Sequence, residues 1–192
     1  MESPISLLHH RGMILLVGAS ASGKTEIAKY LFQRYGMTKA ITHTTRPIRP
    51  SETPDVDYHF VTREEFLALK EKDAFVETTE YNGNFYGCSK AEVSDDKCII
   101  LDPAGIASFL ALRDPHVVTF FIRASKETRF ERMRMRGDDP AAIERRLEVD
   151  EAVFDERAIS PCDFYVESDV AGVPELGDAI YDDYCKRIGY RP

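Results

Sequence analysis

The 192-residue sequence predicts an α/β fold in which helices cover both faces of a parallel, five-stranded core sheet, giving three layers. Three observations support this prediction. Strand-like apolar runs alternate with helical patterns along most of the chain. Two of these runs, Cys98–Leu101 and Val117–Ile122, are almost entirely apolar, as is typical of strands that are buried on both faces. A stretch of small residues, Gly18–Thr25, joins the first strand to the first helix in the arrangement of a phosphate-binding loop.

The core elements are expected in alternating order along the chain. The strands are expected at Met13–Val17, Ala40–Thr42, Lys97–Asp102, Val117–Ile122 and Asp163–Val166. The helices are expected at Gly23–Tyr35, Ala104–Leu112, Lys126–Met135, Ala141–Ala158 and Val173–Ile188. Because a helix separates most successive strands, the strands are expected to run parallel.

Residues 43–95 interrupt this alternation. Short strands are predicted there at Tyr58–Val61, Phe75–Thr79 and Asn84–Tyr86. A helix is predicted at Arg63–Lys72, because Thr62 and Glu65 have the spacing of a capping box. We therefore expect a single domain over residues 1–192, with its core at 1–42 and 96–192 and a small α+β insertion between them. A polar loop, Arg136–Pro140, is a second interruption.

The composition is ordinary for a soluble globular domain. The net charge of −8 argues against a broad nucleic-acid-binding surface, so no nucleic-acid partner is expected. No apolar run reaches membrane-spanning length, and Met1–His10 lacks the basic region of a signal peptide. The four cysteines are far apart and are expected to be reduced thiols that bind no metal. We expect a cytoplasmic protein without a membrane partner, either a monomer or a homodimer.

The stretch from Gly18 to Thr25 fits the pattern G-x-x-x-x-G-K-[ST]. Small residues let its backbone wrap around phosphate oxygens, and the following helix adds its positive end. We expect Lys24 to reach the β- and γ-phosphates of ATP, and the Thr25 hydroxyl to hold Mg²⁺. The alternative, a turn without a ligand, is disfavoured by the flanking strand and helix. The loop residues expected to bind ATP are Gly18, Ala19, Ser20, Ala21, Ser22, Gly23, Lys24 and Thr25.

Asp102 ends a predicted strand and has two candidate roles. A carboxylate at that point can hold Mg²⁺ beside the phosphate loop, directly or through water. It can equally cap the next helix, because Pro103 suits the first helical position. The two roles are compatible, and the spacing alone does not separate them.

Arginines in two parts of the chain are candidates for holding an anionic substrate. Arg46 and Arg49 lie in the hydroxyl-rich segment Thr42–Arg49, and a guanidinium binds phosphate oxygens in bidentate fashion. A second group flanks the polar loop. A loop that closes can bring such arginines onto phosphates, although a charge run is more often a solvated face. This second group comprises Arg132, Arg134, Arg136, Arg145 and Arg146.

Three side chains of the insertion are candidates for contact with an acceptor molecule. Glu77 lies in an apolar stretch, where a carboxylate usually has a partner or a function. It can accept two hydrogen bonds from a base edge with adjacent N–H donors, as guanine has. Tyr58 and Tyr86 can offer hydroxyls to a phosphate, or can be core or edge aromatics, which is the more common role.

Together these motifs resemble the guanylate kinase family, whose members are nucleoside-monophosphate kinases with a P-loop NTPase fold. The matching pieces occur in family order over most of the chain. Besides the phosphate loop they are Thr44-Thr45-Arg46 with Arg49 and Glu52, Asp57-Tyr58, Phe60-Val61, Glu65-Phe66, Phe75 with Glu77, Gly83-Asn84, Tyr86-Gly87, Leu101-Asp102, Arg136-Gly137, Arg146-Leu147, and Asp163 with Val166.

The resemblance implies Mg²⁺-dependent transfer of a phosphoryl group from ATP to a nucleoside monophosphate, most specifically GMP. Residues 43–95 would form the monophosphate-binding region and residues 136–145 the lid. The catalytic residues would be Lys24, Arg46, Arg136 and Arg146, and Arg132 would join Arg136 in binding ATP. The metal would be held by Thr25 and Asp102. The acceptor would be bound by Thr42, Arg46, Arg49, Tyr58, Glu77, Tyr86 and Cys88.

Two base contacts depart from the family pattern. The family usually has Ser or Thr where this chain has Cys88, which is a weaker hydrogen-bonding group. It usually has a second Asp two positions after Leu-Asp, where this chain has Ala104. The alternatives are therefore a related P-loop kinase of another nucleotide or a sugar phosphate, and a non-catalytic binding module. The intact Lys24 and Thr25 argue against the binding module.

Overall fold

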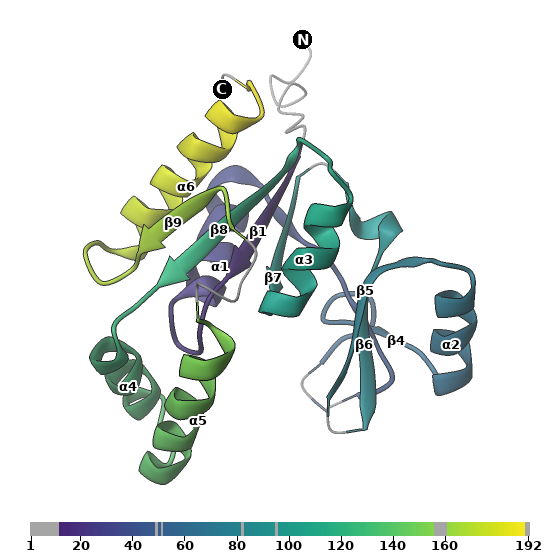
Figure 1. Ribbon diagram of the computed structural model, residues 1–192, viewed down its shortest axis with the longest axis horizontal. Coiled ribbons are helices and arrows are strands. Elements are labelled where there is room, and N and C mark those ends of the chain that lie inside the picture. Colours follow the sequence, from purple (N-terminus) through teal and green to yellow (C-terminus); the bar gives the residue numbers. More distant parts are fainter. Residues whose placement is uncertain are drawn as a thin grey trace.

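The computed structural model describes residues 12–48, 50, 52–81, 83–94, 96–155 and 161–190. Within these residues a five-stranded parallel sheet forms the centre of the molecule, in the order β2-β7-β1-β8-β9. Its strands are β1 (Met13–Val17), β2 (Thr38–Lys39), β7 (Lys97–Leu101), β8 (Val117–Arg123) and β9 (Phe164–Glu167). The predicted α/β fold class is therefore confirmed (Figure 1).

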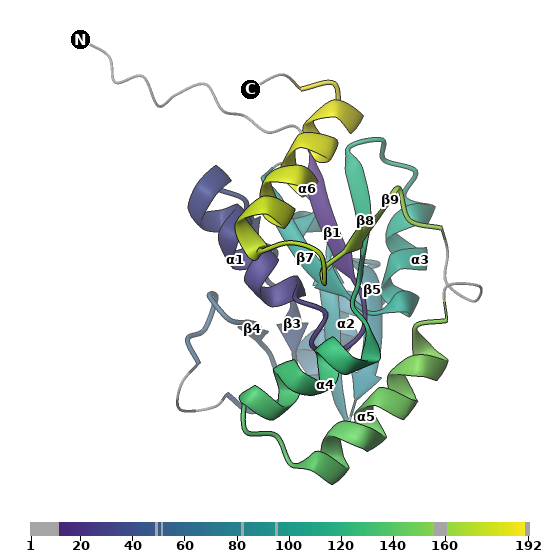
Figure 2. The same cartoon turned by 90° about the vertical axis from the view of Figure 1, so that its left-hand side faces the viewer.

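Helices cover both faces of this sheet (Figure 2). One face carries α1 (Lys24–Tyr35) and α6 (Val173–Arg187), and the other carries α3 (Pro103–Ala111). Successive side chains of β1 explain why both faces need a cover. Ile14 and Leu16 pack into the cluster below α1 and α6, whereas Leu15 and Val17 pack into the cluster that includes Ile106 of α3. A strand that buries both faces has to be apolar throughout, as this one is.

The insertion forms a second sheet with the order β4-β3-β6-β5 (Figure 1). Its elements are β3 (His43–Thr44), β4 (His59–Phe60), α2 (Arg63–Glu71), β5 (Phe75–Tyr81), β6 (Asn84–Ser89) and the 3₁₀ turn η1 (Lys90–Glu92). The predicted capping box is present, because Thr62 Oγ1 accepts from the Glu65 N–H and Glu65 Oε2 accepts from the Thr62 N–H. Phe66 of α2 is buried and stacks on Phe75, which fixes the helix against the sheet.

Two further helices, α4 (Lys126–Met135) and α5 (Pro140–Val153), extend beyond the carboxyl end of the sheet (Figure 1). The polar loop between them was predicted, and so were both ends of α4. The Ser125 Oγ accepts from the Thr128 N–H at the start of α4, which is an N-cap visible in the sequence. None of the helices in the described ranges is both long and apolar enough to cross a bilayer.

The second core strand was predicted in the wrong place. It is Thr38–Lys39 and not Ala40–Thr42. The Ala40 N–H still reaches the Cys98 carbonyl, but the next N–H, that of Ile41, donates to the Glu92 carboxylate at the base of the insertion. The chain therefore leaves the core sheet two residues earlier than its apolar pattern suggests.

Other boundaries differ by smaller amounts. Helix α5 ends at Val153 and not at residue 158, and residues 156–160 lie outside the described part of the chain. Strands β5 and β6 each continue two or three residues past their predicted ends. Asp102 is not the last strand residue but the N-cap of α3, where its Oδ1 accepts from the Gly105 N–H at 2.8 Å.

Candidate active site

The phosphate-binding loop connects β1 to α1 in a conformation that requires its glycines. Gly23 has φ 104°, in the left-handed region that side chains disfavour. At Gly18 a Cβ would lie 2.3 Å from the Ile122 carbonyl oxygen of the neighbouring strand. Only glycine fits these two positions, so the spacing of the motif follows from backbone sterics.

The Lys24 side chain lies against the carbonyl groups of this loop. Its Nζ lies 2.6 Å from the Gly18 carbonyl oxygen and 2.7 Å from that of Ala19. Burial lowers the pKa of the ammonium to about 8, and the carboxylate of Asp150 acts in the opposite direction. The positive charge is thus held in the concavity of the loop, where the phosphates of a nucleotide would bind.

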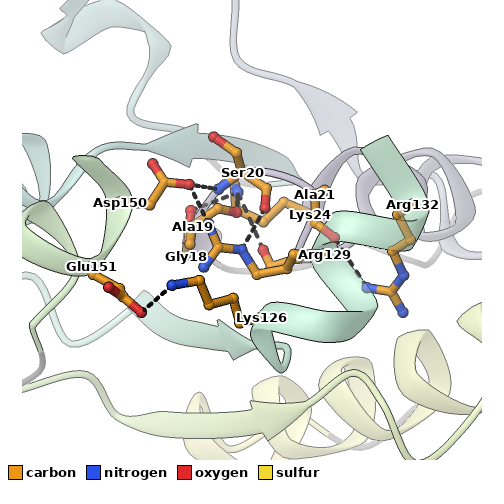
Figure 3. A network of polar contacts seen from close by, with 11 residues as sticks. Gly18, Ala19, Ser20, Ala21, Lys24, Lys126, Arg129, Arg132, Asp150 and Glu151 are labelled. Carbon is orange, nitrogen blue, oxygen red and sulfur yellow. Dashed lines mark hydrogen bonds and ion pairs between the residues drawn. The ribbon is translucent and has the colours of Figure 1, made fainter. Parts of the chain in front are cut away.

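Two charged residues that the sequence analysis did not single out lie against the same loop. Arg129 of α4 and Asp150 of α5 form an ion pair whose side chains are 7% and 9% exposed. The Arg129 Nε donates to the Ser20 carbonyl oxygen at 2.8 Å, and the Ser20 N–H donates to Asp150 Oδ2 at 2.9 Å (Figure 3). The sequence does contain a signal for them, because Arg129 and Asp150 occupy the buried stripes of helices α4 and α5.

Arg132 and Ser168 close the other side of the loop. The Arg132 guanidinium donates to the Ala21 carbonyl oxygen at 3.1 Å and to both Oγ and the carbonyl oxygen of Ser168. The Ser168 hydroxyl in turn donates to the Ser22 carbonyl oxygen at 2.7 Å. A cavity of about 250 Å³ lies alongside, lined by Arg132, Arg136, Gly23 and Ser168 among others.

Not all of the three arginines that were expected to bind the ATP phosphates contact the phosphate loop. Arg132 contacts the loop, and Arg136, which directly follows α4, lies close enough to influence the pKa of Lys24. Arg146 lies exposed on α5. Since α4 and α5 carry all three, a movement of these helices would move the arginines relative to the loop.

The phosphate-binding candidates of the insertion gather around Arg46. Its guanidinium pairs with both carboxylate oxygens of Glu52, at 2.6 and 3.0 Å, and lies 5.5 Å from the centre of the Tyr58 ring. The Tyr58 and Tyr86 rings are 6.2 Å apart in an edge-on arrangement. Arg49 lies outside the described residues. The structure therefore brings Arg46, Tyr58 and Tyr86 together, as the sequence predicted for a phosphate subsite.

Glu77 is a half-buried carboxylate on the same sheet. It pairs in register with Cys88, two positions from Tyr86 on β6, so Glu77 and Tyr86 share one face. Its Oε1 accepts from the Cys88 N–H at 3.0 Å. Burial raises the pKa of Glu77 to about 7, and the negative charge of Asp102 acts in the same direction. A second carboxylate thus lies near Glu77, although this chain has Ala104 where the family pattern usually has an Asp.

The Cys88 thiol lies near the carboxylate of Glu77. The residue is fully buried, in the core cluster that contains Leu101 and Ile106. Burial raises the pKa of the thiol to about 12, and the charge of Glu77 acts in the same direction, so the thiol stays protonated. The Cys88 backbone N–H donates to Glu77 and helps to hold its carboxylate in place.

One cleft reaches from the start of α1 to the insertion. It has a volume of about 690 Å³ and is lined by Thr25 in the first turn of α1, by Thr42 at the end of the core segment and by Tyr58 of the insertion, and much of its other lining lies on α1 and β7. Asp102 follows β7 at the same edge of the sheet at which the phosphate loop follows β1, because Val17 and Leu101 pair in register at the ends of these strands. Thr25, the last residue of the loop, and Tyr58 of the insertion therefore face one space.

A P-loop with basic residues on both sides, next to an insertion that brings Arg46, Tyr58 and Tyr86 together, defines this protein as a nucleotide kinase of the P-loop class. The guanylate kinase family model matches residues 10–169. The chain belongs to the guanylate kinase family.

Individual relatives agree with this assignment. A guanylate kinase from Hahella chejuensis is 36% identical over 147 residues, covering 72% of this chain and 71% of the relative. One from Anaplasma phagocytophilum is 31% identical, covering 96% of this chain and 95% of the relative. The crystal structure of guanylate kinase from Anaplasma phagocytophilum superposes with a TM-score of 0.62 at 26% identity, covering 97% of this chain and 90% of that one.

Proposed function

We propose that this chain transfers the γ-phosphoryl group of ATP to the phosphate of GMP, giving ADP and GDP. The observation that carries the proposal is this cleft, which Thr25 lines at the end of the phosphate loop and Tyr58 lines from the insertion, with Thr42 where the chain leaves the core. A donor and an acceptor bound in these two places would meet between them. Residues 43–95 would act as the monophosphate-binding region and residues 136–145 as the lid.

The choice of guanine rests on the carboxylates. Guanine presents two adjacent N–H donors on its Watson–Crick edge, and an ionised Glu77 can accept from both. Asp102 lies near enough to Glu77 for its charge to raise the pKa of that carboxyl. Adenine has no such pair of donors, and would leave the half-buried carboxylate of Glu77 with the Cys88 N–H as a donor but without the two that guanine supplies, at a cost in free energy.

The reaction needs positioning more than proton transfer. The attacking atom is an oxygen of the GMP phosphate, whose second pKa is about 6, so the group is largely dianionic at neutral pH and needs no catalytic base. The main obstacle is repulsion between two polyanions. Lys24 and the arginines Arg132, Arg136 and Arg146 would offset it from the donor side, and Arg46 and Arg49 from the acceptor side.

The metal-binding candidates suit magnesium. The Thr25 hydroxyl and the Asp102 carboxylate are hard oxygen donors at the same edge of the sheet, and the cap of α3 uses only Oδ1 of Asp102. Mg²⁺ bound there with ATP would neutralise charge on the β- and γ-phosphates. No cluster of three or more metal-ligating side chains occurs within the described residues, which fits an ion held partly by the nucleotide and water.

The cysteines bear on the location of the protein. The four cysteines are buried and form no disulfide, which fits a reducing compartment such as the cytoplasm. We propose a cytoplasmic enzyme that acts on small nucleotides, as a monomer or a homodimer.

An acceptor profile tests the proposed function directly. ADP release from ATP would be measured with GMP, dGMP, AMP, CMP and UMP in a coupled assay. We expect kcat/KM for GMP to exceed that for AMP by about hundredfold or more, because only guanine pairs with the half-buried carboxylate. A flat profile, or a preference for another base, would contradict guanine recognition by Glu77. No transfer to any of the five would point to a sugar phosphate or to a binding module.

A further inference from the structure

The buried pair of Arg129 and Asp150 has no part in the mechanism above. Its two side chains come from different helices, α4 and α5, and meet below the phosphate loop. An ion pair removed from water is costly unless its remaining donors and acceptors also find partners. Here those partners are specific, because both backbone groups of Ser20 are used, one by each member of the pair.

The contacts form a closed arrangement around one residue of the loop. The Ser20 N–H donates to Asp150 Oδ2, the Ser20 carbonyl oxygen accepts from Arg129 Nε, and Arg129 Nη2 donates to the same Asp150 oxygen (Figure 3). Ser20 is therefore held from outside the loop, whereas the carbonyl groups of Gly18 and Ala19 are held from inside by Lys24. Figure 3 shows Asp150 and Arg129 joined by dashed lines to the phosphate loop.

An apolar contact supports the same attachment. Ala21, the next loop residue, is buried in a cluster with Met133 of α4 and with Ile143 and Leu147 of α5. The loop is thus attached to both helices by a polar contact at Ser20 and an apolar one at Ala21. These helices carry the arginines that would approach the donor phosphates.

We propose that Arg129 and Asp150 are positioning residues for the donor half of the site, which hold Ser20 and so fix the phosphate loop relative to the helices that carry the donor-side arginines. The pair is neutral as a whole, so it holds the loop without adding net charge beside the phosphates. A lone carboxylate in its place would repel ATP. The proposal rests on the proposed function only for its kinetic readout, since nucleotide binding by the loop can be measured separately.

The chain provides a matched control. Lys126 and Glu151 form a second ion pair between α4 and α5, but this one is exposed, and no contact with the loop is recorded for it (Figure 3). Glu151→Ala removes an interhelical ion pair one residue away from Asp150 while leaving Ser20 untouched. It separates the effect of holding the loop from that of joining the two helices.

The test compares Asp150→Ala, Asp150→Asn and Glu151→Ala with the wild type by calorimetric binding of ADP and by steady-state kinetics. We expect Asp150→Ala to weaken ADP binding and to raise KM for ATP by about tenfold or more, because the Ser20 N–H loses a charged acceptor. Asp150→Asn keeps an acceptor oxygen and is expected to stay within about threefold of the wild type. Glu151→Ala should change neither quantity, and KM for GMP should remain within about twofold throughout.

A double variant serves as the control for loss of folding. Asp150→Ala alone leaves Arg129 buried without its partner, so its thermal unfolding is compared with that of Arg129→Met/Asp150→Ala, which leaves no buried charge. The double variant is also expected to lose ADP affinity about tenfold, because Ser20 is then held by neither side chain. Three results would overturn the proposal. The double variant could bind ADP as tightly as the wild type does. Asp150→Ala and Glu151→Ala could lose equal ADP affinity, or the only change could be a weaker binding of GMP. If the wild type binds ADP but phosphorylates no GMP, the proposed function is wrong. The ADP measurements still test whether Arg129 and Asp150 position the phosphate loop.

Discussion

The recognition of GMP should depend on pH, because it relies on an ionised Glu77. The pKa of this carboxyl is about 7, raised from 4.5 first by burial and then by the charge of Asp102, with the Cys88 N–H acting in the opposite direction. Only the carboxylate can accept hydrogen bonds from both N–H groups of guanine. Lowering the pH from 8 to 6 therefore removes the form of the enzyme that binds the base.

The size of the effect follows from that pKa. With a value of about 7, the ionised fraction falls from about nine tenths at pH 8 to about one tenth at pH 6. KM for GMP should rise by a similar factor, about tenfold. The GMP phosphate also titrates, with a second pKa of about 6, and contributes about a further twofold at pH 6.

The assay is the coupled measurement of ADP release at saturating ATP, with KM for GMP determined at half-unit steps between pH 6 and pH 8. Glu77→Gln is the matched variant, because it retains the size and one acceptor oxygen but cannot ionise. Its KM should be higher at pH 8 and should change only about twofold over the range, from the phosphate alone. A KM in the wild type that does not vary with pH, or a variant that keeps the full tenfold dependence, would refute the assignment of Glu77 to the base.

Three other outcomes follow from the same structure. Lys24→Met should lower kcat by about a thousandfold without lowering the melting temperature, because a buried, partly desolvated ammonium is replaced by an uncharged chain; near-normal turnover would disprove its role. Arg46→Ala should raise KM for GMP about tenfold and leave KM for ATP unchanged, and the opposite pattern would place Arg46 on the donor side. Glu77→Gln should stabilise the protein at pH 8 by up to about 3 kcal/mol. Because folding raises the pKa of Glu77 from 4.5 to about 7, the wild type loses stability as the pH rises between these two values, and the variant does not. The gain in melting temperature should disappear near pH 4, and a gain equal at both pH values would rule out ionisation as its cause.

Elements with local signals were predictable from the sequence. Helix α4 was predicted with both ends correct, because Ser125 supplies an N-cap and Gly137 follows its last turn. The capping box at Thr62 located α2 in the same way. These signals lie within a few residues of the element they define, so no knowledge of the rest of the fold is needed.

Elements that depend on distant partners were less predictable. The apolar pattern placed the second core strand at Ala40–Thr42, but the strand ends at Lys39 because Glu92, far along the chain, takes the Ile41 N–H. Asp102 was assigned to a metal or a cap from its own neighbours. Its proximity to Glu77, which bears on recognition of the base, is a contact between the core and the insertion.

The sequence by itself determined the chemistry of the phosphate loop, because eight consecutive residues carry the glycines, the lysine and the hydroxyl that phosphate binding needs. It also determined the order of strands and helices. Only the tertiary structure decided that Asp150, 130 residues from Ser20, holds the loop, and that Glu77 has a pKa of about 7. The physical reason is that ionisation and buried pairing depend on which surfaces exclude water from a side chain, and those surfaces come from parts of the chain that meet only in the folded state.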